Sequence, residues 1–130
     1  MRMAIAWLAL GAALALTAGA SRNDEPVESI LARVPEKARA NRNPFATDPQ
    51  AAAAGRKLFE QHCAECHGEE AAGAKRGPSL RSPQLQQATP GQLFWIVTNG
   101  AVRRGMPAWS KLPEQQRWQI ITFLDELRDH

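Results

Sequence analysis

Hydrophobic side chains recur with the period of an α-helix over residues 49–62. Asp48 supplies a capping oxygen in front of this segment, and Pro49 suits the first helical position, which needs no backbone N–H donor. The apolar face consists of Ala51, Ala54, Gly55, Leu58, Phe59 and His62. Because glycine inside a helix costs about 1 kcal/mol relative to alanine, Gly55 predicts that another backbone passes close to this helix.

Two further helices are predicted nearer the C-terminus. Thr89 and Gln92 form a capping box, which starts a short helix that Gly100 ends. The last helix begins at Pro113 and runs to about Arg128. Its apolar stripe consists of Ile120, Ile121, Phe123, Leu124 and Leu127. Residues 68–88 and 100–112 contain glycine and proline without a sustained period, so they are predicted as loops. Since no segment alternates like a strand, the expected fold class is all-α, with three main helices and long loops.

The first 47 residues differ in character from the rest. Arg2, the apolar run that ends at Leu16 and the small residues up to Ala20 predict a secretory signal at residues 1–20, with an uncleaved membrane anchor as the alternative. Residues 21–47 are polar and proline-broken, and are predicted as an N-terminal extension or linker. Val27, Ile30, Leu31 and Val34 would line a short helix there, either transient or docked on the domain or a partner. The domain itself is expected over residues 48–130.

Composition adds a constraint on the cysteines. The chain is 44% hydrophobic and 22% charged, and its net charge of +3 is too small to indicate nucleic-acid binding. Cys63 and Cys66 are the only cysteines. Because an exported protein enters a compartment where free thiols oxidise, both are expected to be chemically occupied. A mutual disulfide, a shared metal and haem attachment are the three candidates.

The motif C-x-x-C-H at residues 63–67 favours haem attachment. Cysteines three residues apart lie on the same side of one helical turn, so both sulfurs can form thioethers with the vinyl groups of one haem. The imidazole of His67 then lies beneath the ring and can bond the iron. A zinc site would need two more ligands, but only His62 and His130 remain as histidines. A thioredoxin-like site would be expected to follow a strand, whereas this motif follows a helix.

From residue 49 to the C-terminus the sequence resembles the class I c-type cytochromes. The likeness rests on GRKLF at residues 55–59, CAECHG at 63–68, GPSL at 77–80, GMPA at 105–108 and the aliphatic and aromatic C-terminal helix. The resemblance implies a small cytochrome c fold with long loops wrapped around one covalent haem c, and Gly55 and Phe59 facing Phe123. It also implies that the carbonyl of Pro78 accepts the Nδ1–H of His67 and fixes that ring.

Met106 is the expected second axial ligand of the iron. It is the only methionine outside the signal, Pro107 disfavours helix at Met106, and Gly105 lets the backbone approach the haem. The resemblance implies the same ligand, because GMPA follows the C-x-x-C-H motif in the family's order. His62 and His130 are the rival ligands. Both are expected to be bystanders, because His62 precedes the attachment cysteine and His130 ends the chain.

The predicted function is one-electron transfer rather than catalysis, because both axial positions of the iron would be filled. The resemblance and the signal imply a periplasmic respiratory or dehydrogenase chain, with a dehydrogenase or reductase as donor and an oxidase as acceptor.

Six cations flank the predicted ligands and would steer an acidic partner, pair with the haem propionates or simply face solvent: Lys75, Arg76, Arg81, Arg103, Arg104 and Lys111. A haem-c subunit of a larger complex is one alternative. A haem enzyme or sensor with an open iron site is another, if Met106 does not bind. Membrane contact is expected only if the signal is uncleaved.

Overall fold

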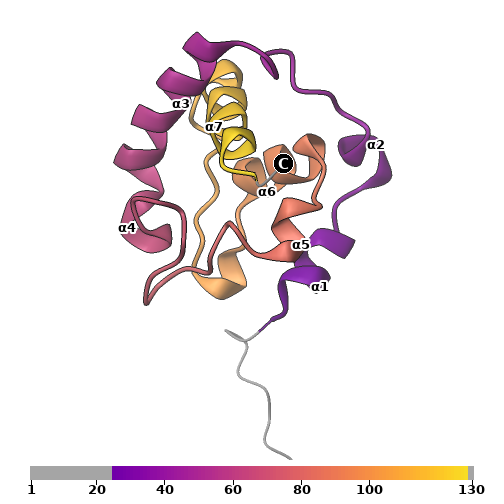
Figure 1. Ribbon diagram of the computed structural model, residues 1–130. Helices are drawn as coiled ribbons and strands as arrows, with labels where there is room; N and C mark the ends of the chain where they lie inside the picture. The colour runs from indigo at the N-terminus through magenta and orange to yellow at the C-terminus, as the bar shows by residue number, and fades with distance from the viewer. Residues whose placement is uncertain (1–24, 129–130) are drawn as a thin grey trace, which may run out of the picture.

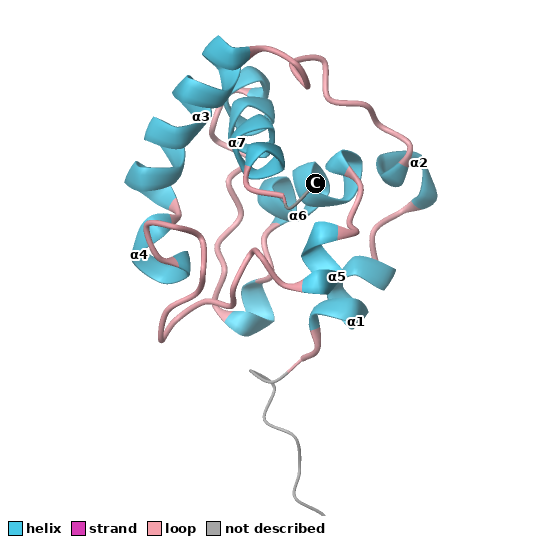
Figure 2. Ribbon diagram, viewed as in Figure 1, coloured by secondary structure: helices cyan, strands magenta, loops and turns pink. Residues whose placement is uncertain are grey.

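The computed structural model describes residues 25–128, so the signal predicted at residues 1–20 and His130 lie outside them. The helices are α1 (Val27–Ala32), α2 (Glu36–Arg39), α3 (Pro49–His62), α4 (Ala64–His67), α5 (Pro83–Gln86), α6 (Pro90–Asn99) and α7 (Glu114–Glu126), with a 3₁₀ turn η1 at Val102–Arg104. The described part contains isolated β-bridges but no strand, which confirms the all-α prediction (Figure 2). Within residues 25–128, no helix combines the length and hydropathy that crossing a bilayer requires.

The two longest helices, α3 and α7, pack against each other (Figure 1). A Cβ at Gly55 would lie 1.8 Å from the backbone oxygen of Gln119, far inside van der Waals contact. One turn along α3, the rings of Phe59 and Phe123 pack with their centroids 5.3 Å apart. The close approach predicted from Gly55 is therefore confirmed. The aromatic pair adjoins the crossing and stabilises it through apolar burial.

Helix α7 joins two apolar clusters. The first cluster consists of Phe59, Ala71 and Phe123, and the second consists of Val97, Trp118 and Ile121. Leu124 contacts both clusters, and the ring of Phe94 stacks on that of Trp118 with their centroids 3.9 Å apart. Helix α7 packs against both α3 and α6, and both interfaces are formed by its apolar face.

Residues 25–47 pack against the domain, so the short helix predicted there is docked. Ile30 and Val34 are 7% and 3% exposed. Helix α1 contacts α5, which lies beside it in Figure 1, and α2 contacts α6. A Cβ at Gly91 of α6 would lie 2.1 Å from the backbone oxygen of Ala38, so the α2 backbone passes directly over this position.

The segment between α2 and α3 is tied to α7 by hydrogen bonds. Asn43 Nδ2 donates to Thr122 Oγ1 at 2.9 Å, and the Thr122 hydroxyl donates toward the backbone oxygen of Phe45 at 3.2 Å. The Phe45 side chain packs against the second cluster. We call residues 26–47 the N-terminal strap. Whether the independently folding unit begins at residue 48 stays a prediction.

Two segments predicted as loops contain short helical turns, and the last helix starts slightly later than predicted. Helix α5 lies within residues 68–88 and η1 within residues 100–112. Pro113 is the N-cap of α7 rather than its first helical residue, and no side-chain oxygen caps the helix. A four-residue helix has too few positions to show a period. Tertiary contacts hold α5 instead, since Arg128 donates to the backbone oxygens of Gln86 and Ala88 at 3.0 and 2.7 Å.

Candidate functional site

The two cysteines lie on one helical turn at the end of α3. Cys63 is both the C-cap of α3 and the N-cap of α4. Its backbone oxygen accepts from the N–H groups of Cys66 and His67 at 3.2 and 2.9 Å. Both thiols are free and half-buried. The local backbone therefore holds two thiols and one imidazole in a single turn, the arrangement that the C-x-x-C-H spacing predicts.

The Cys63 thiol is in an environment that keeps it protonated. Burial, and secondarily the neighbouring Cys66, raise the pKa of Cys63 from 9.0 to about 11. Thiol–disulfide enzymes need the opposite, a thiolate at neutral pH with a lowered pKa. The electrostatics of Cys63 therefore argue against a thioredoxin-like redox site.

The ring of His67 is buried and held by one hydrogen bond. The side chain is 8% exposed, and its Nδ1 lies 2.9 Å from the backbone oxygen of Pro78. A carbonyl can only accept, so Nδ1 carries the proton and Nε2 carries the lone pair. The adjacent Gly77 makes this approach possible. A Cβ there would lie 2.7 Å from the Cys66 oxygen and 3.0 Å from His67 Nδ1.

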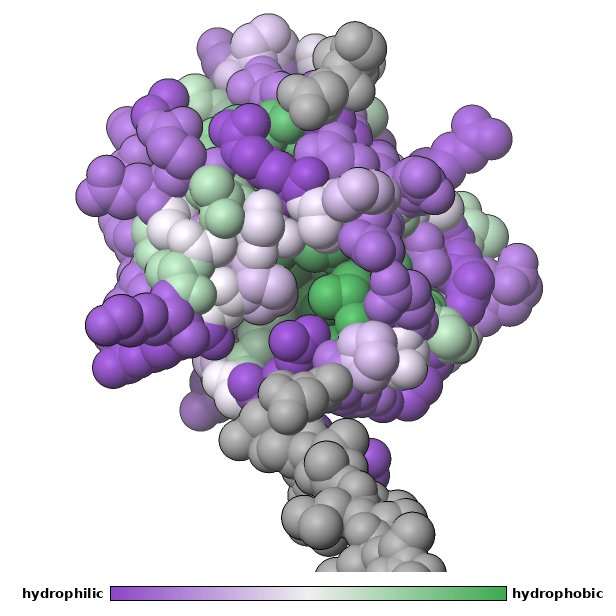
Figure 3. Space-filling view, turned by 60° about the horizontal axis from the view of Figure 1, so that its bottom comes forward, coloured by the Kyte–Doolittle hydropathy of each residue, from purple (hydrophilic) through white to green (hydrophobic). Residues whose placement is uncertain are grey.

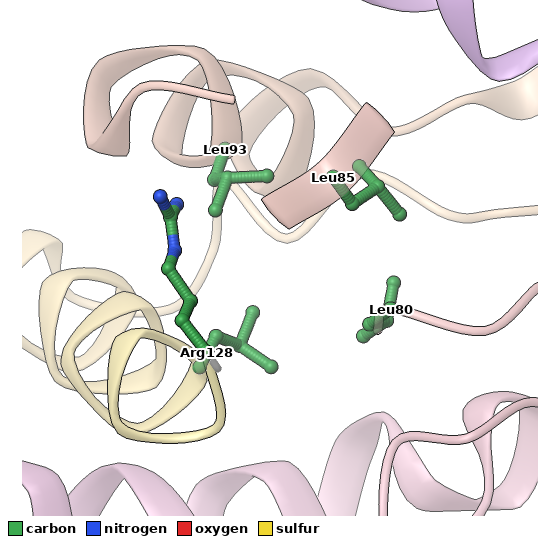
Figure 4. Close-up of a pocket in the computed structure, with 5 residues that line it drawn as sticks. Leu80, Leu85, Leu93 and Arg128 are labelled. Carbon is green, nitrogen blue, oxygen red and sulfur yellow. The ribbon is translucent and has the colours of Figure 1, made fainter. Parts of the chain in front are cut away.

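Leucines from the loop before α5 and from α5, α6 and α7 line an apolar pocket next to the first cluster. Its lining residues are Leu80, Leu85, Leu93, Leu124 and Arg128 (Figure 4). Leu80 and Leu124 pack against the same cluster as Cys63. In the space-filling view, the lower face of the molecule is hollowed and hydrophobic groups lie at the bottom of the hollow (Figure 3). The pocket is thus a small apolar space that borders the cluster on which Cys63 packs.

Met106 is presented by a tight hairpin after α6. Ala101 and Met106 exchange two backbone hydrogen bonds, each 3.1 Å long, and Gly105 adopts the left-handed conformation. Gly100 lies against the returning chain, where its Cβ would be 2.7 Å from the backbone nitrogen of Ala108. The Met106 side chain is half-buried against the second cluster.

His62 and two of the predicted surface cations make contacts with other side chains. The ring of His62 packs against Trp109, with centroids 5.0 Å apart. Arg76 pairs with Glu65 at 3.0 Å, and Arg81 lies 3.9 Å from the Glu70 carboxylate. The other four predicted surface cations form no ion pair among the described residues, namely Lys75, Arg103, Arg104 and Lys111. The carboxylates of Glu65 and Glu70 therefore offset part of the positive charge that Arg76 and Arg81 could present to an acidic partner.

Sequence reasoning missed Arg128 as part of the pocket. Its guanidinium donates to the backbone oxygens of Gln86 in α5 and of Ala88 beyond it, and Arg128 also lines the apolar pocket (Figure 4). The available signal was weak, because an arginine in the last turn of a helix is common and usually interacts with that helix's own dipole. Its acceptors lie about forty positions away in the sequence and could not be identified from the local pattern.

The donor set at residues 63–67 fits a covalently attached haem. Among residues 25–128, no group of three or more histidine, cysteine, aspartate or glutamate side chains could hold a metal. A tetrahedral zinc site would need such a group. Two thiols, one oriented imidazole and an apolar lining match the requirements of a covalently attached haem.

Comparison with known proteins identifies similar chains. Residues 50–124 match the family described as cytochrome c oxidase, cbb3-type, subunit III. Over 59 residues the chain is 41% identical to the cbb3-type cytochrome c oxidase subunit CcoP of Rubrivivax gelatinosus, which covers 45% of this chain and 19% of that subunit. It is 34% identical over 92 residues to cytochrome c550 of Pseudomonas aeruginosa, which covers 66% of this chain and 62% of that protein.

A solved structure gives the same result. Cytochrome cL from Methylophaga aminisulfidivorans matches with a TM-score of 0.56 and 29% identity, over 64% of this chain and 57% of that chain. The chain thus spans less than two thirds of each of these three relatives. The matched region, residues 50–124, includes the C-x-x-C-H turn, Pro78 and Met106.

Proposed function

Because this chain belongs to the cbb3-type cytochrome c oxidase subunit III family of class I c-type cytochromes, we propose that Cys63 and Cys66 bind one haem c covalently and that His67 ligates its iron. The observation that carries the proposal is the C-x-x-C-H turn in which Nδ1 of a buried His67 is 2.9 Å from the Pro78 oxygen. This bond leaves Nε2 free for iron and fixes the plane of the ring. The bound group supplies one-electron chemistry, since haem iron alternates between the ferric and ferrous states.

Met106 is the proposed second axial ligand. It is the only methionine among residues 25–128, and the Ala101–Met106 hairpin restricts its backbone. A thioether ligand stabilises ferrous over ferric iron and so raises the reduction potential, as does burial in an apolar pocket. With His67 and Met106 both bound, the iron would offer no open position to a substrate. The protein then transfers electrons and does not itself transform a substrate.

The proposed setting is a periplasmic respiratory or dehydrogenase chain, reached through export by residues 1–20. A dehydrogenase or reductase supplies the electron, and an oxidase accepts it. The similarity to a CcoP subunit and to cytochrome c550 supports two forms of this role, a subunit of a larger complex and a separate carrier. Copurification of the exported protein with membrane oxidase subunits separates the two forms.

Optical spectra before and after acid–acetone extraction test the covalent haem. The haem absorption is expected to stay with the protein, and Cys63→Ala/Cys66→Ala is expected to release or lose it. Haem that moves into the organic phase from the wild-type protein would contradict the attachment.

Ferric spectra test Met106. Met106→Leu is expected to abolish the sulfur-to-iron charge-transfer band and to let cyanide bind readily, while His62→Gln leaves both unchanged. If wild-type protein lacks the band and binds carbon monoxide or cyanide freely at neutral pH, the iron has an open site. The enzyme or sensor alternative then replaces electron transfer.

A further inference from the structure

Arg117 occupies an unfavourable position in α7 and makes unusual contacts there. It lies at the N-terminal end of the helix, where the macrodipole disfavours a positive charge. Its Nε donates to the Leu112 backbone oxygen at 3.1 Å, and its Nη1 donates to Thr98 Oγ1 at 2.6 Å. The guanidinium carbon lies 4.9 Å above the ring of Phe94. The side chain is half-buried and forms no ion pair within residues 25–128, so these contacts are what hold it in place.

The two hydrogen-bond acceptors of Arg117 lie at opposite ends of the segment that carries Met106. Thr98 is in the last turn of α6, and its hydroxyl also donates to the Phe94 oxygen at 2.8 Å. Leu112 immediately precedes Pro113, the N-cap of α7, which offers no capping side chain. One guanidinium therefore joins the residue before the loop to the residue after it.

We propose that Arg117 is a positioning residue for Met106, because it closes residues 99–111 into a loop of fixed ends. Inside that loop, the Ala101–Met106 hairpin and the bond from Trp109 N–H to the Val97 oxygen at 2.9 Å set the local shape. Leu112 is linked to α6 by backbone bonds only indirectly, because its N–H donates to the Trp109 oxygen at 3.0 Å, whereas Arg117 bonds both Leu112 and Thr98 of α6 with one side chain. Fixing both ends reduces the number of conformations that the loop can adopt and so limits where the sulfur can move. The effect on the iron rests on the proposed Met106 ligation, whereas the effect on the loop does not.

Two substitutions in the haem-loaded protein separate this role from a general contribution to folding. Arg117→Lys keeps the charge and much of the apolar stem, but a single ammonium cannot reproduce the fork that reaches both acceptors. Thr98→Val removes one acceptor at nearly constant shape and leaves Arg117 and its bond to Leu112. Arg56→Lys is the matched control, because Arg56 is exposed on α3 and pairs with Glu60 of the same helix.

Trypsin reports on the loop without reference to iron, because Arg103, Arg104 and Lys111 lie within it. We expect cleavage after these residues to accelerate about tenfold in both Arg117→Lys and Thr98→Val, the factor expected from losing one hydrogen bond to a charged group. Cleavage after Lys57 in α3 is expected to stay at the wild-type rate. Mass spectrometry assigns each cut.

Imidazole binding to the ferric protein reports on the sulfur–iron bond. We expect its apparent affinity to rise about tenfold in the two variants, with a weakened sulfur-to-iron band, and to be unchanged in Arg56→Lys. Wild-type values for both loop cleavage and imidazole affinity would overturn the proposal. So would an equal acceleration of cleavage in α3, which would mean that Arg117 stabilises the whole fold.

If Arg117→Lys does not fold, Thr98→Val decides the question. If Met106→Leu leaves the band and the imidazole affinity unchanged, Met106 ligation fails, while loop cleavage still tests the role of Arg117.

Discussion

Two glycines permit the close contacts on which the candidate site depends. A Cβ at Gly77 would press on the Cys66 oxygen and the His67 ring, and a Cβ at Gly55 would overlap the Gln119 oxygen of α7. In both cases the nearest atom is a backbone oxygen, which cannot rotate away as the end of a flexible side chain can. Gly77 therefore controls how His67 is oriented, and Gly55 controls how close α3 and α7 approach.

Substituting Gly55 by alanine gives a test in which two physical effects have opposite signs. Helix propensity alone predicts that Gly55→Ala stabilises the protein by about 1 kcal/mol. The 1.8 Å overlap with the Gln119 oxygen predicts instead that overpacking destabilises it by about 1–3 kcal/mol. We expect the overpacking effect to be the larger one, so that urea unfolding of the haem-loaded protein gives a lower free energy of unfolding for Gly55→Ala than for the wild type. Ala53→Gly, at an exposed position of the same helix, measures the propensity effect without the overlap. A stabilised Gly55→Ala variant would mean that the helices separate at little cost.

The chemistry of the candidate site is readable from sequence only where it is local. The spacing of Cys63, Cys66 and His67 suffices, because one helical turn converts that spacing into proximity. The contact between His67 and Pro78 was expected from family resemblance alone, and its role toward an iron stays a prediction. Arg117 could not be assigned a role in advance, because its acceptors are a hydroxyl and a backbone oxygen on other segments. Nothing in the periodicity of a helix identifies such partners.

At the level of elements, capping chemistry predicted helix starts well. Asp48 caps α3 by accepting from Gln50 N, and Thr89 and Gln92 form the predicted capping box of α6. These signals work because cap and helix are neighbours in the chain. The short helix α5 and the docking of the strap were not predictable in this way, because contacts between distant segments stabilise them. Thr122, for example, bonds residues of the strap almost eighty positions away.

Removing the N-terminal strap tests whether it is a linker or part of the folded unit. A chain in which the export segment is joined directly to residue 48 loses the buried side chains of Ile30 and Val34 and the contact of Phe45 with the second cluster. We expect it to be less stable by about 2–5 kcal/mol, the range seen when one large apolar side chain is removed from a core. Urea unfolding of the haem-loaded protein measures the change.

A milder variant controls for the loss of chain length. Ile30→Ser/Val34→Ser in the full chain is expected to reproduce most of the destabilisation, while Ser29→Ala/Glu36→Ala, at exposed positions of the same strap, is expected to be neutral. Equal stability of the truncated and full-length proteins would show that the strap is dispensable and that the domain begins at residue 48.

At the level of the whole molecule, the apolar core is divided rather than continuous. The cluster around Phe123 and the cluster around Trp118 are both small, and Leu124 of α7 links them. Leucines of the apolar pocket come from α5, α6, α7 and the loop before α5, and residues 68–82 and 105–113 contain no helix. Loops of that length in a small domain need an organising group other than their own backbone hydrogen bonds. A covalent haem attached at Cys63 and Cys66 would supply such a group.

Because the apolar core consists of two small clusters, we expect that the haem-free chain does not fold cooperatively. A small domain already buries a limited fraction of its surface, and loss of the haem exposes the leucines of the pocket on one side. We expect Cys63→Ala/Cys66→Ala, produced without haem attachment, to lose the near-UV circular dichroism of its tryptophans and to unfold in urea over a broad range with a reduced m-value. The haem-loaded wild-type protein, which should show one sharp transition, is the control. A haem-free chain that kept the same m-value and near-UV signal would mean that the two clusters, joined by α7, suffice for the fold and that the haem only fills a preformed cavity.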